Sequence, residues 1–181
     1  MRFKFLLVST AVLALGIPVG IPVGGAAVAM DVQTLEAATA LLYPGAKLIP
    51  ADFTLTGDQM ERIKSEYDVP LMRPGVKAWR VDGGGWLFLD QVYGLSDIVT
   101  YMVAVDDSGA VSGVEILVCA EGFCDTSTPR WRAQLLGKTR GKWQPKEAVQ
   151  IISGTTLSSV HVTEGVKKLL AIHALFLPKT P

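Results

Sequence analysis

An apolar face recurs along the last long segment of the chain, Leu157–Phe176. Its helical spacing predicts the longest helix of the domain. A stripe of apolar residues with helical spacing usually packs into the core, so His173 is expected at the edge of the domain's core. Two shorter helices are predicted nearer the N-terminus, over residues 33–43 and from Thr56 to about Glu66. The face has the helical spacing i, i+4, i+7, i+8 and i+11, at Val162, Val166, Leu169, Leu170 and His173.

Between these helices the pattern changes to short runs of Val, Ile, Leu, Trp and Tyr, bounded by turns rich in Asp and Gly. A further short strand is predicted at Ala148–Ile152 and a short helix at Pro129–Leu136. The pattern predicts one α+β domain with an antiparallel sheet of about four to five strands packed with helices, and a core over about residues 77–176. The main predicted strands form two tight hairpins: Lys77–Val81 with Trp86–Val92, and Ile98–Val105 with Val111–Val118.

The N-terminal segment has the order of a secretory signal peptide, predicted over residues 1–29. Arg2 and Lys4 precede an uncharged run that ends in the small-x-small sequence Ala27-Val28-Ala29. Cleavage there leaves residues 30–181 as the folded domain. The alternative is a retained membrane anchor, since roughly 20 apolar residues span a bilayer. Glycines and prolines in the second half of the run favour cleavage, and either outcome places the domain outside the cytoplasm.

Composition narrows the possible classes of function. The chain has 181 residues with 17 Lys+Arg and 17 Asp+Glu. Loss of residues 1–29 leaves 15 basic against 17 acidic residues, a net charge of −2. A nucleic-acid partner is excluded, because binding it needs a clear excess of Lys and Arg. With two His and two Cys in the chain, no metal site is expected.

The two cysteines, Cys119 and Cys124, are separated by four residues. In an oxidising compartment this spacing favours a small loop closed by a disulfide. A redox dithiol and a pair of free thiols are the alternatives, and the dithiol is disfavoured because reactive pairs have a tighter spacing at a helix start.

A cluster of hydroxyl side chains marks the start of the long helix. It surrounds Gly154, where the chain is predicted to turn from a strand into the helix. A helix start offers unpaired N–H groups and the positive end of a dipole, so the cluster suits a phosphate group. Ordinary N-capping by Ser and Thr is the alternative. The hydroxyl residues are Ser153, Thr155, Thr156, Ser158 and Ser159.

The run Ser-Gly-Thr-Thr-Leu-Ser-Ser at 153–159 resembles the Ser-Gly-Ala-Thr-x-Ser/Thr-Ser signature of the FMN-binding domain family. That family includes flavin-bearing subunits of the sodium-translocating NADH:quinone reductase and of the Rnf complex, and many small exported flavoproteins. The resemblance implies FMN as cofactor, linked through its phosphate to Thr156 by a flavin transferase outside the cytoplasm. It also implies a phosphate site shaped by Ser153, Gly154, Thr155, Leu157, Ser158 and Ser159.

Other segments are similar to the same family. Val99–Asp106 and Gly113–Leu117 resemble its central strands, and Glu121 matches a recurring acidic position that the resemblance adds to the cofactor site. Thr155 replaces the usual Ala, which leaves two adjacent threonines as candidates for the modified residue. Cys124 falls near a position where the family tends to have Gly.

These inferences predict an exported electron-transfer flavoprotein, in the periplasm or at the outer face of the cytoplasmic membrane. FMN on Thr156 would relay electrons between membrane or periplasmic redox partners. The sequence shows no general acid–base pair and no Gly-x-Gly-x-x-Gly after a strand. An electron carrier or a subunit of a redox system is therefore expected, rather than a stand-alone enzyme. The alternative is a flavin-free structural or adaptor domain, which the intact Thr156 disfavours.

Aromatic and basic residues add two open questions. Tyr101, Phe123, Trp131 and Trp143 could stack on a flavin ring, although core packing is expected for each. A basic run could face an anionic partner, a membrane surface, the FMN phosphate or only solvent: Arg130, Arg132, Lys138, Arg140, Lys142 and Lys146.

Overall fold

Four consecutive strands form the centre of the sheet. The computed structural model describes residues 31–121, 124–150 and 156–177, of which Asp31 and Val32 are described by their backbone alone. Each of the four strands is antiparallel to the next along the chain, so the predicted meander is confirmed. The strands are β4 (Gly75–Val81), β5 (Trp86–Tyr93), β6 (Ile98–Val105) and β7 (Val111–Cys119).

Three further strands lie at the margins of the sheet and were not predicted. Strand β1 (Asp31–Val32) pairs with β7, whereas β2 (Leu48–Pro50) and β3 (Phe53–Thr54) both pair with β4. The main path of the sheet has the order β1-β7-β6-β5-β4-β2. The described chain thus has seven strands, against the predicted four to five. The additional strands were missed because two or three residues are too few to show an alternating pattern.

Strand β6 is buried on both faces. Tyr101 and Val103 point into the larger core, whereas Met102 and Ala104 point into a smaller one on the opposite face. Helix α1 (Leu35–Leu42) covers the smaller core with Ala38. The smaller core therefore lies between the sheet and α1.

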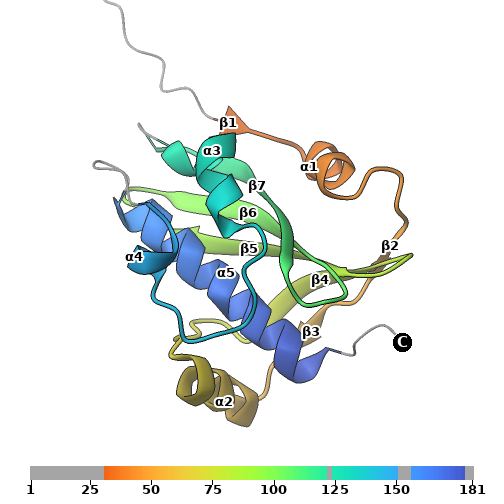
Figure 1. Ribbon diagram of the computed structural model, residues 1–181, viewed down its shortest axis with the longest axis vertical. Helices are drawn as coiled ribbons and strands as arrows, with labels where there is room; N and C mark the ends of the chain where they lie inside the picture. Colours follow the sequence, from red (N-terminus) through yellow and green to blue (C-terminus); the bar gives the residue numbers. More distant parts are fainter. Residues whose placement is uncertain (1–30, 122–123, 151–155, 178–181) are drawn as a thin grey trace, which may run out of the picture.

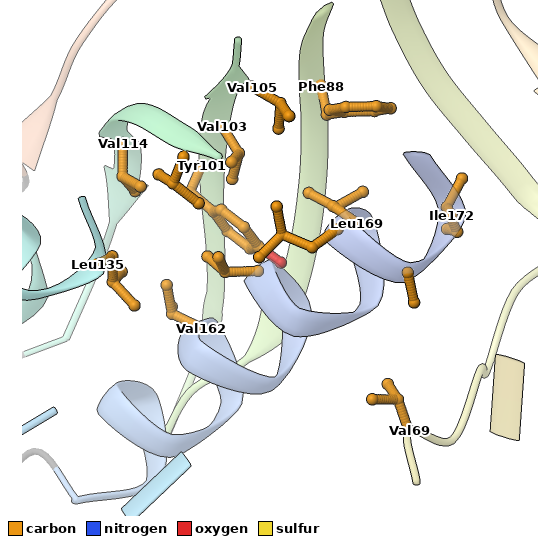
Figure 2. Close-up of a cluster of buried hydrophobic side chains, with 14 of the residues drawn as sticks. Val69, Phe88, Tyr101, Val103, Val105, Val114, Leu135, Val162, Leu169 and Ile172 are labelled. Atoms are coloured by element: carbon orange, nitrogen blue, oxygen red, sulfur yellow. The ribbon is translucent and has the colours of Figure 1, made fainter. Parts of the chain in front are cut away.

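Helix α5 (Thr156–Phe176) covers the other face of the sheet (Figure 1). Its predicted apolar face is buried, and His173 is 6% exposed. Figure 2 shows Tyr101 pointing from the sheet toward this helix, among Val162 and Leu169. Helix α2 (Gly57–Tyr67) starts with a capping box between Thr56 and Gln59 and also packs against α5.

The helix lies very close to the sheet at Gly165. A Cβ at this position would collide with the Tyr101 hydroxyl. That hydroxyl donates to Asp90 Oδ2 at 2.6 Å, and Lys168 Nζ pairs with the same carboxylate oxygen at 2.6 Å. Burial raises the pKa of Tyr101 well above its ordinary value, and the negative charge of Asp90 and the hydrogen bond to it add to the shift. Glycine therefore lets α5 approach a buried polar pair in β5 and β6.

The strand predicted at Ala148–Ile152 is wrong over its described part. Pro145–Ala148 forms the short helix α4, and Val149 follows it with 4% exposure. Proline at the first helical position favours the short helix α4. Val149 is apolar because it is buried in the core, and not because it belongs to a strand. The remainder of the predicted strand, residues 151–152, lies outside the described residues.

The short helix predicted at Pro129–Leu136 is divided in two. Helix α3 (Pro129–Arg132) continues into a 3₁₀ turn, η2 (Ala133–Leu135), before Gly137 reverses the chain with φ +72°. The predicted signal peptide, residues 1–29, lies outside the described residues. None of the described helices is long and apolar enough to cross a membrane.

We expect Gly165→Ala to lower the free energy of unfolding by about 1–3 kcal/mol, because the added methyl overpacks the contact with Tyr101. Gly57→Ala is the matched control, since a Cβ there would meet nothing within 4 Å at the start of α2. Urea unfolding of both variants measures the difference. Equal stability of the two variants would contradict the close approach.

Asp106, in the turn after β6, is expected to make the protein less stable in acid. Burial of Asp106 acts to raise its pKa, but hydrogen bonds from Ser108, Ala110 and Gly109 outweigh this and hold the pKa below its ordinary value. A lowered pKa gives stability that is present above the unfolded-state value, about 3.9, and is lost as the pH falls through the folded-state value.

Asp106→Asn keeps an oxygen that can accept the bonds from Ser108 and Ala110 but does not titrate. We therefore expect the variant to lose less stability than the wild-type protein between about pH 5 and about pH 3, measured by urea unfolding. If the variant and the wild-type protein lose the same unfolding free energy between these two pH values, Asp106 does not contribute to the loss of stability in acid.

Candidate functional site

The first turn of α5 divides the predicted hydroxyl cluster into residues with different roles. Thr156 is exposed at the start of the helix, and Leu157 beside it is 44% exposed. Ser158 and Ser159 are both fully buried. The other predicted members of this run, Ser153, Gly154 and Thr155, lie outside the described residues.

Ser158 is joined to Glu121, which is 4% exposed. The Ser158 hydroxyl donates to Glu121 Oε2, and the backbone N–H groups of Leu95 and Ser96 donate to Oε1, with the Ser96 bond at 3.2 Å. A buried carboxylate is tolerated when donors of this kind compensate its lost hydration. Glu121 therefore connects the loop between β5 and β6 to the first turn of α5.

Gly94 allows the loop to approach this carboxylate. A Cβ at Gly94 would collide with Glu121 Oε1, and the Gly94 N–H closes the turn by donating to the Asp97 carbonyl at 2.7 Å. The requirement for glycine comes from the close approach. It explains why the chain can place two successive N–H groups, of Leu95 and Ser96, on one side-chain oxygen.

Ser159 faces the interior of the domain. Its hydroxyl has no hydrogen-bond partner among the described residues, and its backbone carbonyl accepts from Thr163 Oγ1 at 2.6 Å. The single hydroxyl proton of Ser158 is directed to Glu121. Both hydroxyls are buried, so Thr156 is the exposed hydroxyl among the described residues of this turn.

The start of α5 fits a phosphate group. The first N–H groups of a helix have no partner within it, and the helix dipole favours an anion there. The negative charge of Glu121 lies nearby, but three donors already compensate it. The hydroxyl of Thr156 and the N–H groups of this turn are the described groups that could hold the phosphate of a cofactor.

Exposed apolar side chains surround the same end of α5. Tyr93 is 68% exposed and Leu95 is 64% exposed. The strand end that carries Tyr93 is tied to the helix, because His161 Nδ1 donates to the Tyr93 carbonyl at 2.5 Å. Sequence reasoning missed Tyr93, Leu95 and His161 as site residues. No periodic signal marks them, since they come together only through the packing of α5.

Of the four candidate stacking aromatics, the structure describes Tyr101, Trp131 and Trp143. Tyr101 and Trp131 are buried in the main core, as expected from core packing, and Phe123 lies outside the described residues. Trp143 is half-buried and has the ammonium groups of Lys138 and Lys167 over its ring, at 5.7 Å and 5.9 Å from the centroid.

The basic run does not converge on one site. Arg132 pairs with Glu115 at 3.1 Å, and Lys138 packs on Trp143. The other members are exposed, and no ion pair of theirs is found within the described chain: Arg130, Arg140, Lys142 and Lys146.

Cys119 and Cys124 form a disulfide, with an S–S distance of 2.11 Å and a Cα–Cα distance of 6.3 Å. Cys119 is the last residue of β7 and is fully buried, whereas Cys124 is half-buried. Glu121 lies within the loop that this bond closes. The disulfide and the Glu121 contacts therefore belong to one structural unit beside the start of α5.

Comparison with known proteins agrees with this geometry. Residues 94–171 match the family model of the FMN-binding domain. The comparison with curated proteins gives no match. The matched segment begins at Gly94, includes Glu121, and ends within α5, so it contains the described donors of the Glu121 carboxylate: Leu95, Ser96 and Ser158. The part of the chain from residue 94 to residue 171 belongs to the FMN-binding domain family, and FMN is its cofactor.

Proposed function

We propose that the protein is an exported electron-transfer flavoprotein that carries FMN covalently on Thr156. The observation that carries this proposal is the position of Thr156, whose exposed hydroxyl stands at the start of α5 within the matched segment. FMN supplies one- and two-electron chemistry, and the protein supplies binding and orientation. Its partners would be an electron donor and an acceptor in the membrane or the periplasm.

The covalent link is a phosphodiester. A bond forms between Thr156 Oγ1 and the phosphorus of an activated flavin nucleotide, while the hydroxyl loses its proton and the nucleotide leaving group departs. A flavin transferase would provide the activation and the base for this step. The helix start favours the product, because the phosphate lies where unpaired N–H groups and the dipole attract an anion.

Export is part of the same proposal. The charge order of residues 1–29 supports a signal peptide, and a disulfide is typical of proteins outside the cytoplasm. A cofactor bound through an ester would not be lost by diffusion from such a protein.

Thr156→Val removes the proposed attachment atom and should abolish covalent labelling. The measurement is flavin fluorescence on a denaturing gel after co-expression with an active flavin transferase. Because Thr156 is exposed, the variant should fold normally, which its thermal unfolding will show. Thr139→Val, at an exposed threonine outside α5, is the matched control and should keep the fluorescent band.

Two outcomes would contradict the assignment to Thr156. A band that persists in Thr156→Val and disappears in Thr155→Val would assign the link to the adjacent threonine. A wild-type protein that stays unlabelled beside a labelled positive control would overturn the covalent link itself.

Glu121→Gln should weaken the site while leaving the rest of the fold in place. The amide keeps the shape of the carboxylate but loses its charge, so the bonds from Leu95 and Ser96 weaken and the Ser158 hydroxyl must accept from the new NH2 group instead of donating, at a cost of about 1–2 kcal/mol. We expect a lower Tm and a several-fold slower rate of flavin labelling, measured well below that Tm. Glu115→Gln removes the charge from a partly buried pair with Arg132, outside the first turn of α5.

Glu115→Gln should therefore lower the Tm and leave the labelling rate unchanged. Equal labelling rates in the two variants would show that Glu121 has only a general role in stability.

A further inference from the structure

The disulfide encloses the residue that organises the start of α5. Cys119 ends β7, and Cys124 precedes the short 3₁₀ helix η1 (Asp125–Ser127). Between them, Glu121 accepts hydrogen bonds from Leu95, Ser96 and Ser158. None of these donors belongs to the disulfide loop. The position of the Glu121 backbone within that loop therefore decides whether all three hydrogen bonds form together.

We propose that the Cys119–Cys124 disulfide positions Glu121, so that the oxidised protein has an ordered flavin site and the reduced protein does not. The part of this inference that concerns flavin rests on the function proposed above. The part that concerns Glu121 and the loop at Leu95 does not need a flavin.

Both ends of the disulfide are attached to ordered structure. On one side, Cys119 is fully buried at the end of a central strand. On the other side, the Cys124 carbonyl accepts from the Ser127 N–H at 3.1 Å and from the Ser127 hydroxyl at 2.8 Å. The covalent bond joins these two fixed points across a short loop and restricts the backbone positions open to Glu121.

Without the bond, less constrains the Glu121 backbone. Strand β7 ends at Cys119, before Glu121, and η1 is held through other contacts, since Arg132 Nη1 donates to the Ser127 carbonyl at 2.5 Å. Reduction should therefore leave the sheet and η1 in place while the carboxylate leaves its donors. A change confined to Glu121 and its donors would distinguish a role of the disulfide in positioning Glu121 from a role in the stability of the whole fold.

The chemistry of opening the bond is that of thiol–disulfide exchange with an external dithiol. A thiolate of the dithiol attacks Cys124, the half-buried partner, and forms a mixed disulfide while Cys119 leaves as a thiolate and takes up a proton. The second thiol of the reagent then releases Cys124. Two electrons and two protons pass to the protein, and the dithiol becomes a disulfide.

The first test uses flavin-free protein and amide hydrogen exchange measured by mass spectrometry. The N–H groups of Leu95 and Ser96 should exchange at least about tenfold faster after reduction with dithiothreitol, because their acceptor is lost. The α2 segment, residues 57–67, is the internal control and should not change. Equal protection of Leu95 and Ser96 in both redox states would overturn the inference.

The double variant Cys119→Ala/Cys124→Ala repeats the measurement without a reductant, and reduced wild-type protein serves if that variant does not fold. In a Glu121→Ala background the two amides should already exchange fast in the oxidised protein, and reduction should add nothing. A further increase in that background would show that the disulfide acts through general stability rather than through Glu121.

The second test compares flavin labelling of the oxidised and reduced proteins by a transferase that is active in the presence of dithiothreitol. We expect labelling of the reduced protein to be at least about tenfold slower. Equal labelling would overturn the flavin part of the inference while the covalent link stands. No labelling of either form beside a labelled positive control, together with the change at Leu95 and Ser96, would support the positioning of Glu121 and overturn the covalent link.

Discussion

The close approach of α5 to the sheet sets the position of the candidate site. Gly165 brings the helix backbone against Tyr101, and the hydroxyl of Tyr101 and the ammonium of Lys168 share the Asp90 carboxylate. An α-helix is stiff and rises about 1.5 Å per residue, so fixing Gly165 also fixes Thr156 about 14 Å away along the axis. Packing in the interior therefore places the start of the helix before any contact at the site itself.

Glu121 adds a second constraint on the same helix. Its carboxylate is buried and needs the donors from Leu95, Ser96 and Ser158 together, because a buried charge that loses donors carries a large desolvation cost. The loop between β5 and β6, the disulfide loop and the first turn of α5 consequently have one arrangement in which all their polar groups are satisfied. The segment matched by the family model begins at Gly94 and contains the residues that make these contacts in all three segments.

Sequence reasoning succeeds where the signal is local. The face of α5, the start of α2 near Thr56 and the hairpin turns depend on residues a few positions apart, and all were predicted. It fails where the partner is distant or is a backbone group. The donors of Glu121 include the N–H groups of Leu95 and Ser96, which carry no side-chain signal.

Helical geometry also separates hydroxyl residues that look equivalent in the sequence. Within the run at 153–159, Ser158 and Ser159 turn inward and Thr156 stays outside. Strand β3, with only two residues, has no pattern to detect. Val149 illustrates a different limit, because a short apolar run is compatible with a strand or with a turn that tertiary packing buries.

The exposure of the site connects the two parts of the proposed function. Tyr93, Leu95 and Leu157 are between 44% and 68% exposed around the end of α5 that carries Thr156. A cofactor held against such a surface buries only part of its area, and affinity depends on buried contacts after the cost of ordering is subtracted. A covalent link removes the need for high affinity. The same exposure would leave the cofactor within reach of a redox partner, so the proposed tether and the proposed electron transfer both depend on one property of the site.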